Sequence, residues 1–269
     1  MAGRTLTLLV IALVAVSTAA AGQPVPEHYY LSLGDSLAYG MQPDKAARGL
    51  PPSGFSTGYT DVVAKRLRAL NPTLEVVNYS CPGESTVTYV RGHCEWLTEG
   101  KKLHDPFPTT QEQAALAFLR THKGEVSPIT LTLWGNDIFP AFDTCRTLAC
   151  IKTRAPKVLT AFIGRFAPII ARLRAAAPDA TIVVTGPWNF DAPSLKVLAG
   201  LYGELDAAMR RAATAAGARF ADVRPLFNPS VGTKARICAY SFICSADDPH
   251  PTDAGYRAYA KAILAAAGY

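Results

Sequence analysis

The chain reads LSLGDSLAYG over residues 31–40, and the organisation of the rest follows from this stretch. The apolar run at 28–33 predicts a buried β-strand, and Gly34-Asp35-Ser36 predicts a tight turn at its end. Such a turn leaves Ser36 exposed at the carboxyl edge of the strand, which is where open α/β sheets bind their ligands. A serine hydroxyl there can be a nucleophile if a base lies beside it, although Gly, Asp and Ser are also common in turns without a catalytic role.

Strand-like and helix-like segments alternate along the remaining chain. Short apolar runs rich in β-branched residues predict strands at 28–33, 74–79, 128–134, 180–185 and 219–223. Longer segments predict helices at 58–70, 110–122, 154–176, 194–216 and 252–267. This alternation predicts an α/β fold with one central parallel sheet of five strands, right-handed crossovers and helices on both faces. The long irregular stretches, at 40–57, 80–109 and 135–153, are expected to gather at one edge of the sheet.

Residues 1–22 have the pattern of a secretory signal peptide. Arg4 precedes a nearly unbroken apolar run from Leu6 to Val16, and small residues follow with an A-x-A pattern, which predicts cleavage after Ala21. The apolar run is too short to predict a membrane anchor, and nothing charged follows it to stop transfer. We therefore expect a secreted protein without stable membrane insertion, in which residues 23–269 form one domain.

The composition is that of an ordinary globular domain. Hydrophobic residues make up 49% of the chain and charged residues 18%, which suits a chain with a substantial core. The formal net charge is +6, but the basic residues are scattered and form no long run, so a nucleic-acid partner is not expected. For a secreted domain of this size we expect a monomer.

All six cysteines lie after residue 22. An even number of cysteines in an exported chain favours disulfides over metal or thiol chemistry. Proximity along the chain suggests the pairs Cys81–Cys94, Cys145–Cys150 and Cys238–Cys244, although six cysteines allow many other connectivities. Each pair would close a short loop, so we expect the bridges to brace loops while the core holds the domain together.

His250 is the histidine whose surroundings fit a catalytic base. It lies in Asp247-Asp248-Pro249-His250-Pro251, just before the last predicted helix, for which Thr252 is the expected N-cap. A carboxylate three residues earlier, Asp247, can bend back to one imidazole nitrogen and leave the other free to accept a proton. An Asp-rich loop that only caps a helix would look the same, because Asp and Pro are ordinary before helices.

Two further loops follow strands and offer hydrogen-bond donors. Gly83 lies just after the second predicted strand and would let the backbone approach a substrate closely. Asn136, just after the third, carries a side-chain NH2 group. With the backbone N–H of Ser36, these make three donors on three neighbouring strand ends, which is what an acyl-transfer site needs for its oxyanion. Singly, each is also explained as a turn glycine or an Asx-turn.

Four short blocks occur in order along the chain: Gly34-Asp35-Ser36-Leu37, Gly83, Gly135-Asn136-Asp137 and Asp247-x-x-His250. Together they resemble the GDSL/SGNH hydrolase superfamily and span nearly all of residues 23–269. The resemblance implies a flavodoxin-like three-layer α/β/α sandwich. It implies Ser36 as nucleophile, His250 as base and Asp247 as the partner of the base, with Ser36 N–H, Gly83 N–H and the Asn136 side chain as the oxyanion hole. Three short disulfides are also similar to those of secreted esterases and lipases of this group.

One residue departs from the pattern of that superfamily. The third block usually reads Gly-x-Asn-Asp, and Trp134 stands where the first glycine is usual. A bulky indole there is expected to narrow the acyl site or repack the sheet, which leaves the size of the substrate open. Five aromatic residues are candidates for the walls of an apolar cleft, although such side chains more often lie in the core: Phe55, Phe107, Phe139, Phe142 and Trp188.

These observations predict a secreted serine ester hydrolase, a carboxylesterase or lipase that acts on small-molecule or lipid esters through an acyl-enzyme on Ser36. Two alternatives stay open: a carbohydrate acetyl esterase acting on acetylated polysaccharide, and a secreted binding protein that keeps the fold without turnover. No cofactor or metal is expected, because there is no Gly-rich phosphate loop and His93-Cys94-Glu95 has no spaced partner pair. Ser56 lies in a G-x-S-x-G pattern at 54–58, but no strand is predicted before it, as a nucleophile elbow requires.

Overall fold

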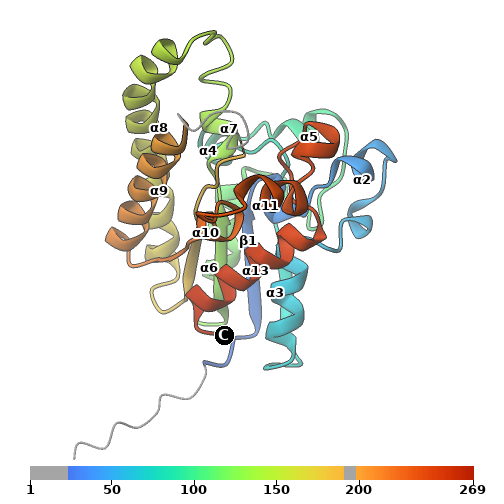
Figure 1. The fold of residues 1–269 in the computed structure, drawn as a ribbon. Helices are drawn as coiled ribbons and strands as arrows, with labels where there is room; N and C mark the ends of the chain where they lie inside the picture. The colour runs from blue at the N-terminus through green and yellow to red at the C-terminus, as the bar shows by residue number, and fades with distance from the viewer. Residues whose placement is uncertain (1–23, 191–197) are drawn as a thin grey trace, which may run out of the picture.

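The structure is a computed structural model that describes residues 24–190 and 198–269. Five parallel strands form one sheet in the order β2-β1-β3-β4-β5 (Figure 1). Their bounds are Tyr29–Gly34 for β1, Glu75–Asn78 for β2, Val126–Thr132 for β3, Ile182–Thr185 for β4 and Arg219–Ala221 for β5. This is the strand order of flavodoxin-like doubly wound folds, so the predicted fold class is confirmed.

β1 lies inside the sheet, between β2 and β3. It pairs with β2 from Tyr29 to Ser32 and with β3 as far as Gly34, which lies opposite Thr132. Strands covered on both faces read as continuous apolar runs, and every residue of β1 after Tyr29 is buried. The strand order reverses at β1 and β3, and ligands of such sheets bind outside the carboxyl ends at this switch point. The fold therefore brings the end of the first strand to the expected position for a site.

Two layers of helices cover the sheet (Figure 1). α3 (Tyr59–Arg68) packs against α13 (Asp253–Ala267), and α6 (Gln111–Thr121) and α9 (Leu198–Ala215) both pack against α8 (Leu148–Ala176). These are the five helices predicted from the sequence; residues 194–197 of one prediction lie outside the described residues. α8 begins at Leu148 rather than at residue 154, because Thr147 caps it and accepts a hydrogen bond from the Cys150 N–H.

Short helices lie between the longer elements. α1 (Ser36–Tyr39) directly follows β1, and the first two of the predicted irregular stretches contain α2 (Pro43–Ala47), the 3-10 turn η1 (Pro52–Gly54), α4 (Thr86–Arg91) and α5 (Glu95–Thr98). α7 (Gly135–Ile138) follows β3, and α10 (Arg224–Phe227), α11 (Thr233–Tyr240) and α12 (Ile243–Ala246) precede α13. Helices of one or two turns are too short for an apolar period to show in the sequence. Ser56 follows η1 rather than a strand and is exposed, so it lacks the context of a nucleophile elbow.

The main core lies between the sheet and its helices. It includes fully buried side chains from β1, α8 and α13, such as Leu31, Phe162 and Tyr259. A second, smaller cluster, which contains Phe55 and Trp96, forms among the loops that follow β1 and β2. The loops at the carboxyl edge of the sheet therefore have a packed interior of their own, which holds their backbone in place.

Three disulfides join Cys81 to Cys94, Cys145 to Cys150 and Cys238 to Cys244, which confirms the predicted pairs. Each closes a short loop, and the first lies within the second cluster. Disulfides persist in oxidising compartments and are typical of extracellular proteins. The predicted signal peptide, residues 1–22, lies outside the described residues. Among the helices of 24–190 and 198–269, none combines the length and hydropathy that crossing a bilayer requires.

Leu173 tests the core, because its side chain in α8 is 1% exposed. Leu173→Ala should lower the free energy of unfolding by about 2–5 kcal/mol, since it removes apolar contacts and leaves a cavity. Urea unfolding followed by circular dichroism measures the change. Val231 is 84% exposed and provides the control, because Val231→Ala should change the same quantity by less than about 0.5 kcal/mol. Equal losses in the two variants would contradict the packing described here.

Candidate active site

The turn after β1 depends on a glycine. Gly34 has φ +125°, and a Cβ atom there would lie 2.0 Å from the backbone oxygen of Thr132 on β3, so only glycine fits. Asp35 follows as the N-cap of α1, and its side chain accepts a hydrogen bond from the Leu37 N–H at 2.9 Å. Ser36 is then the first residue of α1, where its backbone N–H has no acceptor within the helix. Its hydroxyl and its N–H are thereby both available at the carboxyl edge.

Ser36 and His250 are in contact although 214 positions separate them in sequence. The Ser36 Oγ lies 2.8 Å from His250 Nε2, and the other ring nitrogen, Nδ1, lies 2.7 Å from Asp248 Oδ1. All three side chains are partly buried. A serine, an imidazole and a carboxylate in this series have the geometry of an activated nucleophile, a base and the group that orients the base.

The carboxylate beside His250 is Asp248 and not Asp247, as the sequence suggested. Asp247 is exposed and ends α12 with φ +52°. This left-handed residue turns the chain so that the Asp248 side chain lies beside His250. The Oδ1 atom of Asp248 also accepts a hydrogen bond from the His250 backbone N–H at 2.7 Å. Two adjacent acids precede His250, and nothing in their spacing distinguishes the one that faces the ring.

The environment of Asp248 keeps its carboxyl group ionised. Burial acts to raise the pKa of Asp248, but the hydrogen bonds from His250 and the charge of that ring outweigh burial, so the pKa is lowered. An ionised acceptor at Nδ1 holds the proton on that nitrogen and leaves Nε2 free to accept one from Ser36. The order of the three groups therefore fixes the direction in which a proton moves.

Backbone hydrogen bonds hold the loop that carries His250. The Phe242 N–H donates to the His250 carbonyl at 3.0 Å, and the Thr252 N–H donates to the Tyr240 carbonyl at 3.0 Å. These bonds flank a short antiparallel bridge between Ser241 and Pro251. The disulfide between Cys238 and Cys244 closes the same segment. The position of the imidazole is therefore set by main-chain contacts rather than by packing of the ring alone.

Gly83 and Asn136 line the same cleft as Ser36 and His250. Gly83 lies in the loop after β2 with φ +86°, and a Cβ there would lie 2.8 Å from the Cβ of Glu95. Asn136 is the second residue of α7, and one hydrogen of its amide is donated to the Glu84 carbonyl at 2.9 Å. The same NH2 group has a second hydrogen to donate. The three predicted donors are thus brought to one cavity.

A buried glutamine joins the ends of β1 and the loop after β2. The Gly34 N–H donates to Gln111 Oε1 at 2.6 Å, while Gln111 Nε2 donates to the Gly34 carbonyl at 3.0 Å and to Glu84 Oε2 at 2.9 Å. Burial raises the pKa of Glu84 to about 7 and the pKa of Asp35 to about 8. The sequence does not indicate this role for Gln111, because Gln111 lies in the first turn of an ordinary amphipathic helix.

A second polar group connects the loop after β2 with α7, and we call it the Asp137 bracket (Thr86, Asp137 and Arg165). The side chain of Asp137 is 1% exposed and accepts hydrogen bonds from the Thr86 N–H at 2.7 Å and the Thr86 hydroxyl at 2.5 Å. Arg165 of α8 donates to Asp137 at 3.1 Å and to the Thr86 hydroxyl at 2.8 Å. The bracket fixes the neighbours of Gly83 and Asn136 relative to each other. Arg165 is one of four arginines in α8, so the sequence gives no signal for this role.

The cleft above Ser36 encloses about 340 Å³ and is mostly apolar. Its walls include the rings of Trp134, Phe139, Trp188 and Phe190. Trp134 is 2% exposed and packs against Phe139, with ring centroids 5.4 Å apart, so the bulky residue in the third block forms a wall of the cleft. Such a cavity can hold a small to medium organic molecule.

The five aromatic residues proposed for the cleft lie in different places. Phe139 and Trp188 line it, while Phe142 lines a neighbouring cavity. Phe55 is buried in the second cluster, and Phe107 packs against that cluster. Aromatic type alone does not separate a cleft wall from a core residue, because both bury the ring.

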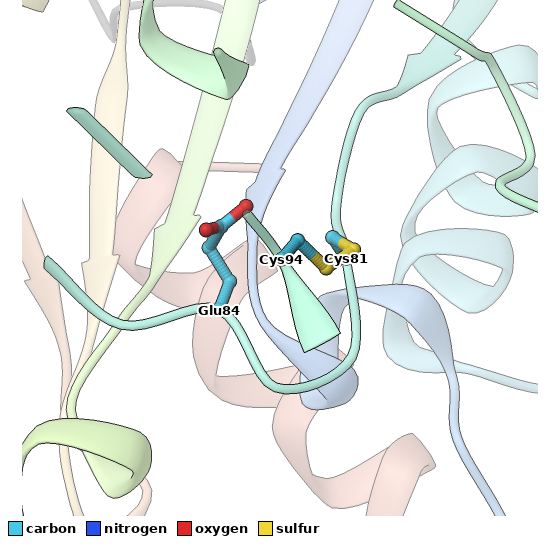
Figure 2. Close-up of side chains that lie close together, drawn as sticks. All are labelled: Cys81, Glu84 and Cys94. Carbon is cyan, nitrogen blue, oxygen red and sulfur yellow. A yellow bond between two sulfur atoms is a disulfide. The ribbon is translucent and has the colours of Figure 1, made fainter. Parts of the chain in front are cut away.

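Three further side chains are of residue types that bind metal ions, but two of them are joined in a disulfide. Candidate ligand atoms of Cys81, Glu84 and Cys94 lie within 4.8 Å of one another. Figure 2 shows the two sulfur atoms joined in a disulfide beside Glu84. A thiolate is the form of cysteine that binds metal ions, and a disulfide sulfur is not one. Glu84 is bonded to Gln111 instead, so this group has a structural role.

Comparisons with known structures agree on the fold. An acetylxylan esterase from Geobacillus stearothermophilus is 16% identical and has a TM-score of 0.59, with 91% of this chain and 96% of that chain covered. A phospholipase A1 from Streptomyces albidoflavus NA297 is 19% identical with a TM-score of 0.57, with 89% and 99% covered. An α/β hydrolase enzyme from the metagenome of Lake Arreo, Spain, is 18% identical with a TM-score of 0.55, with 92% and 98% covered.

A comparison with the curated proteins gives no match in sequence. The model of the GDSL-like lipase/acylhydrolase family, in contrast, matches residues 32–258. This range contains the turn after β1, both donor loops and the His250 segment. The chain therefore belongs to the GDSL-like lipase/acylhydrolase family and is a carboxylic ester hydrolase.

Proposed function

We propose that the protein is a secreted serine carboxylesterase or lipase that forms an acyl-enzyme on Ser36. The observation that carries this proposal is the 2.8 Å contact between Ser36 Oγ and His250 Nε2 at the floor of an apolar cleft. A hydroxyl alone is a poor nucleophile at neutral pH, and a neutral imidazole within hydrogen-bond reach activates it. Asp248 takes the part of the third group, in place of the Asp247 expected from the sequence.

Acylation begins when His250 Nε2 takes the Ser36 proton as Oγ attacks the ester carbonyl. The electron pair of the C=O bond moves onto oxygen and gives a tetrahedral oxyanion. His250, now an imidazolium ion beside the Asp248 carboxylate, gives its proton to the alcohol oxygen as the C–O bond breaks. The products of this step are the free alcohol and an ester of Ser36.

The oxyanion has three donors in this scheme: the N–H groups of Ser36 and Gly83 and the free amide hydrogen of Asn136. The contact of Asn136 with the Glu84 carbonyl supports its role, because it orients the amide before substrate binds. Donors that are held in place need no reorganisation as charge develops, and losing one lowers kcat by about 10²- to 10³-fold.

Deacylation uses the same groups with water as the nucleophile. His250 takes a proton from the water as the water oxygen attacks the acyl carbon. The second oxyanion collapses, the bond to Ser36 Oγ breaks, and Oγ takes the proton back from His250. A carboxylic acid is released and the enzyme returns to its starting state.

Secretion is the second part of the proposal. The pattern of residues 1–22 supports it, since this segment reads as a signal peptide. The three disulfides agree with it, because such bonds form and persist outside the cytosol.

A carbohydrate acetyl esterase would use the same groups and is the alternative within this chemistry. The fold is shared with an acetylxylan esterase as well as with a phospholipase A1. Release of acetate from acetylated xylan, measured beside hydrolysis of p-nitrophenyl butyrate and octanoate, separates the two. Faster turnover of the glycan than of both simple esters would favour the carbohydrate esterase.

Ser36→Ala should lower hydrolysis of p-nitrophenyl butyrate by at least about 10⁴-fold, because no other group forms the acyl-enzyme. The wild-type protein should be labelled by a fluorophosphonate, and the variant should not. Circular dichroism should show the same folded spectrum for both proteins. Full activity in the variant would refute Ser36 as nucleophile, and an unlabelled wild-type protein would favour a binding protein without turnover.

The two neighbouring acids provide a matched pair of variants. Asp248→Asn should lower kcat on the order of 10²- to 10⁴-fold, because the amide no longer holds the His250 tautomer or stabilises the imidazolium ion. Asp247→Asn should leave kcat within about twofold, because Asp247 is exposed and Asn readily adopts a left-handed conformation. A large loss in Asp247→Asn with little effect in Asp248→Asn would reverse the assignment.

The Asp137 bracket is tested by two arginines of α8. Arg165→Met should lower kcat on p-nitrophenyl butyrate about tenfold or more with little change in KM, because the oxyanion donors lose their fixed spacing. Arg172→Met is the control: Arg172 pairs with Glu112 at 2.6 Å and is 42% exposed, compared with 40% for Arg165. It should leave kcat within about twofold. Equal effects on kcat would assign both pairs to stability alone.

A further inference from the structure

A second cavity, which we call the α8–α9 cavity, lies beside the catalytic cleft and encloses about 240 Å³. Ile151, Val158 and Leu159 of α8 contribute to its walls, and so do Leu198 and Leu201 of α9. In Figure 1 the first turns of α8 rise beyond the carboxyl edge of the sheet, with α9 alongside. Among the lining residues that the structure describes, the one with a charged side chain is Asp143, which is exposed.

The cavity continues an apolar stripe that elsewhere forms core. On α8, Val158 is followed at helical spacing by Phe162 and Phe166, which are both fully buried. Val158 itself is only half-buried, as are its neighbour Leu159 and, on α9, Leu201. The apolar face of α8 is therefore covered by core side chains at Phe162 and Phe166, whereas at Val158 it lines the cavity. An apolar ligand in the cavity would remove this surface from water without burying an unpaired polar group.

Two aromatic rings belong to both the cleft and the α8–α9 cavity. Phe139 and Phe190 line each of them, and their ring centroids are 4.8 Å apart in an edge-to-face arrangement. Phe139 also lies against Gly135, since a Cβ there would be 2.9 Å from its ring. The α8–α9 cavity thus begins one side-chain layer away from Asn136, the side-chain donor of the cleft.

The chemistry of the proposed reaction indicates which half of an ester extends towards the α8–α9 cavity. His250 must face the alcohol oxygen to protonate it, so the alcohol leaves on the side of the His250 loop. The carbonyl oxygen points to Ser36 N–H, Gly83 N–H and Asn136. The acyl chain must leave by another side of the cleft, and Phe139 and Phe190 are walls of the cleft that also line the α8–α9 cavity.

We propose that the α8–α9 cavity receives the distal part of the acyl chain, so that the preferred substrates are esters of medium- to long-chain fatty acids. This inference rests on the proposed function, because it takes Ser36 as the atom that carries the acyl group. A chain longer than the cleft passes the Phe139–Phe190 pair and places its methylene groups against Val158, Leu159 and Leu201. A lipid ester is thereby favoured over an acetylated glycan.

The test is a chain-length series of p-nitrophenyl esters, from acetate through butyrate and octanoate to dodecanoate. In the wild-type protein, kcat/KM should rise by up to about fourfold for each methylene group that enters the cavity. Val158→Trp and Leu201→Trp should fill the cavity and lower kcat/KM for dodecanoate at least about tenfold. They should leave the value for acetate within about twofold, because an acetyl group does not reach beyond the cleft.

Thr160→Trp is the matched control, because Thr160 is an exposed residue of α8 that does not line the cavity. It should leave the whole series within about twofold of the wild-type values. Unchanged dodecanoate turnover in Val158→Trp and Leu201→Trp would overturn the cavity as the chain site. A wild-type protein that hydrolyses acetate but not dodecanoate would overturn the substrate class while leaving the proposed function intact. No hydrolysis of any ester would reject the proposed function itself.

Binding provides a readout that does not depend on turnover. Decanoate should bind the Ser36→Ala protein in isothermal titration calorimetry, and adding Val158→Trp should weaken the binding at least about tenfold. Equal affinity in the two proteins would count against the α8–α9 cavity even if the esters are hydrolysed. Weaker binding in the filled variant would support the cavity as the place where the alkyl chain binds.

Discussion

The close approach of β1 and β3 at Gly34 is the constraint on which the site depends. A Cβ at this position would lie 2.0 Å from a backbone oxygen of β3, so position 34 has room for a hydrogen atom only. Both backbone groups of Gly34 are then bound by Gln111, which leaves the end of the strand no freedom to shift. Since Asp35 and Ser36 follow directly, the position of Ser36, the proposed nucleophile, is set by a steric limit in the backbone.

The other parts of the site are held by polar contacts as well as by apolar packing. Gln111 joins Gly34 to Glu84, and the Asp137 bracket joins Thr86 to Arg165. Burying carboxyl groups is unfavourable unless they are paired or neutral, and both solutions occur here. Asp137 has an arginine partner, whereas burial shifts the pKa of Glu84 to about 7. The burial of these two carboxyl groups is thus unfavourable in itself, but their hydrogen bonds fix the loops around the cleft.

Much of this arrangement can be read from the sequence, and the reasons for the remainder are physical. The five strands and five long helices were predictable, because buried runs and 3.6-residue periods extend over enough residues to show. Ser36, Gly83, Asn136 and His250, which line one cleft, could be proposed as site residues because each stands beside the end of a predicted element. The prediction that Asp247 contacts His250 is wrong. Asp248 makes this contact, because Asp247 has a left-handed backbone conformation that turns the chain. Gln111 and Arg165 gave no signal, because their partners come from segments far away in sequence.

The separation of 214 positions between Ser36 and His250 has a consequence during synthesis and folding of the chain. Ser36, the proposed nucleophile, emerges early in synthesis, while His250 and Asp248 arrive just ahead of the final helix. A growing or truncated polypeptide therefore carries a hydroxyl that nothing activates. Under the proposed mechanism, hydrolysis requires the segment just before α13 to be in place, so a chain whose C-terminal part has not folded is inactive.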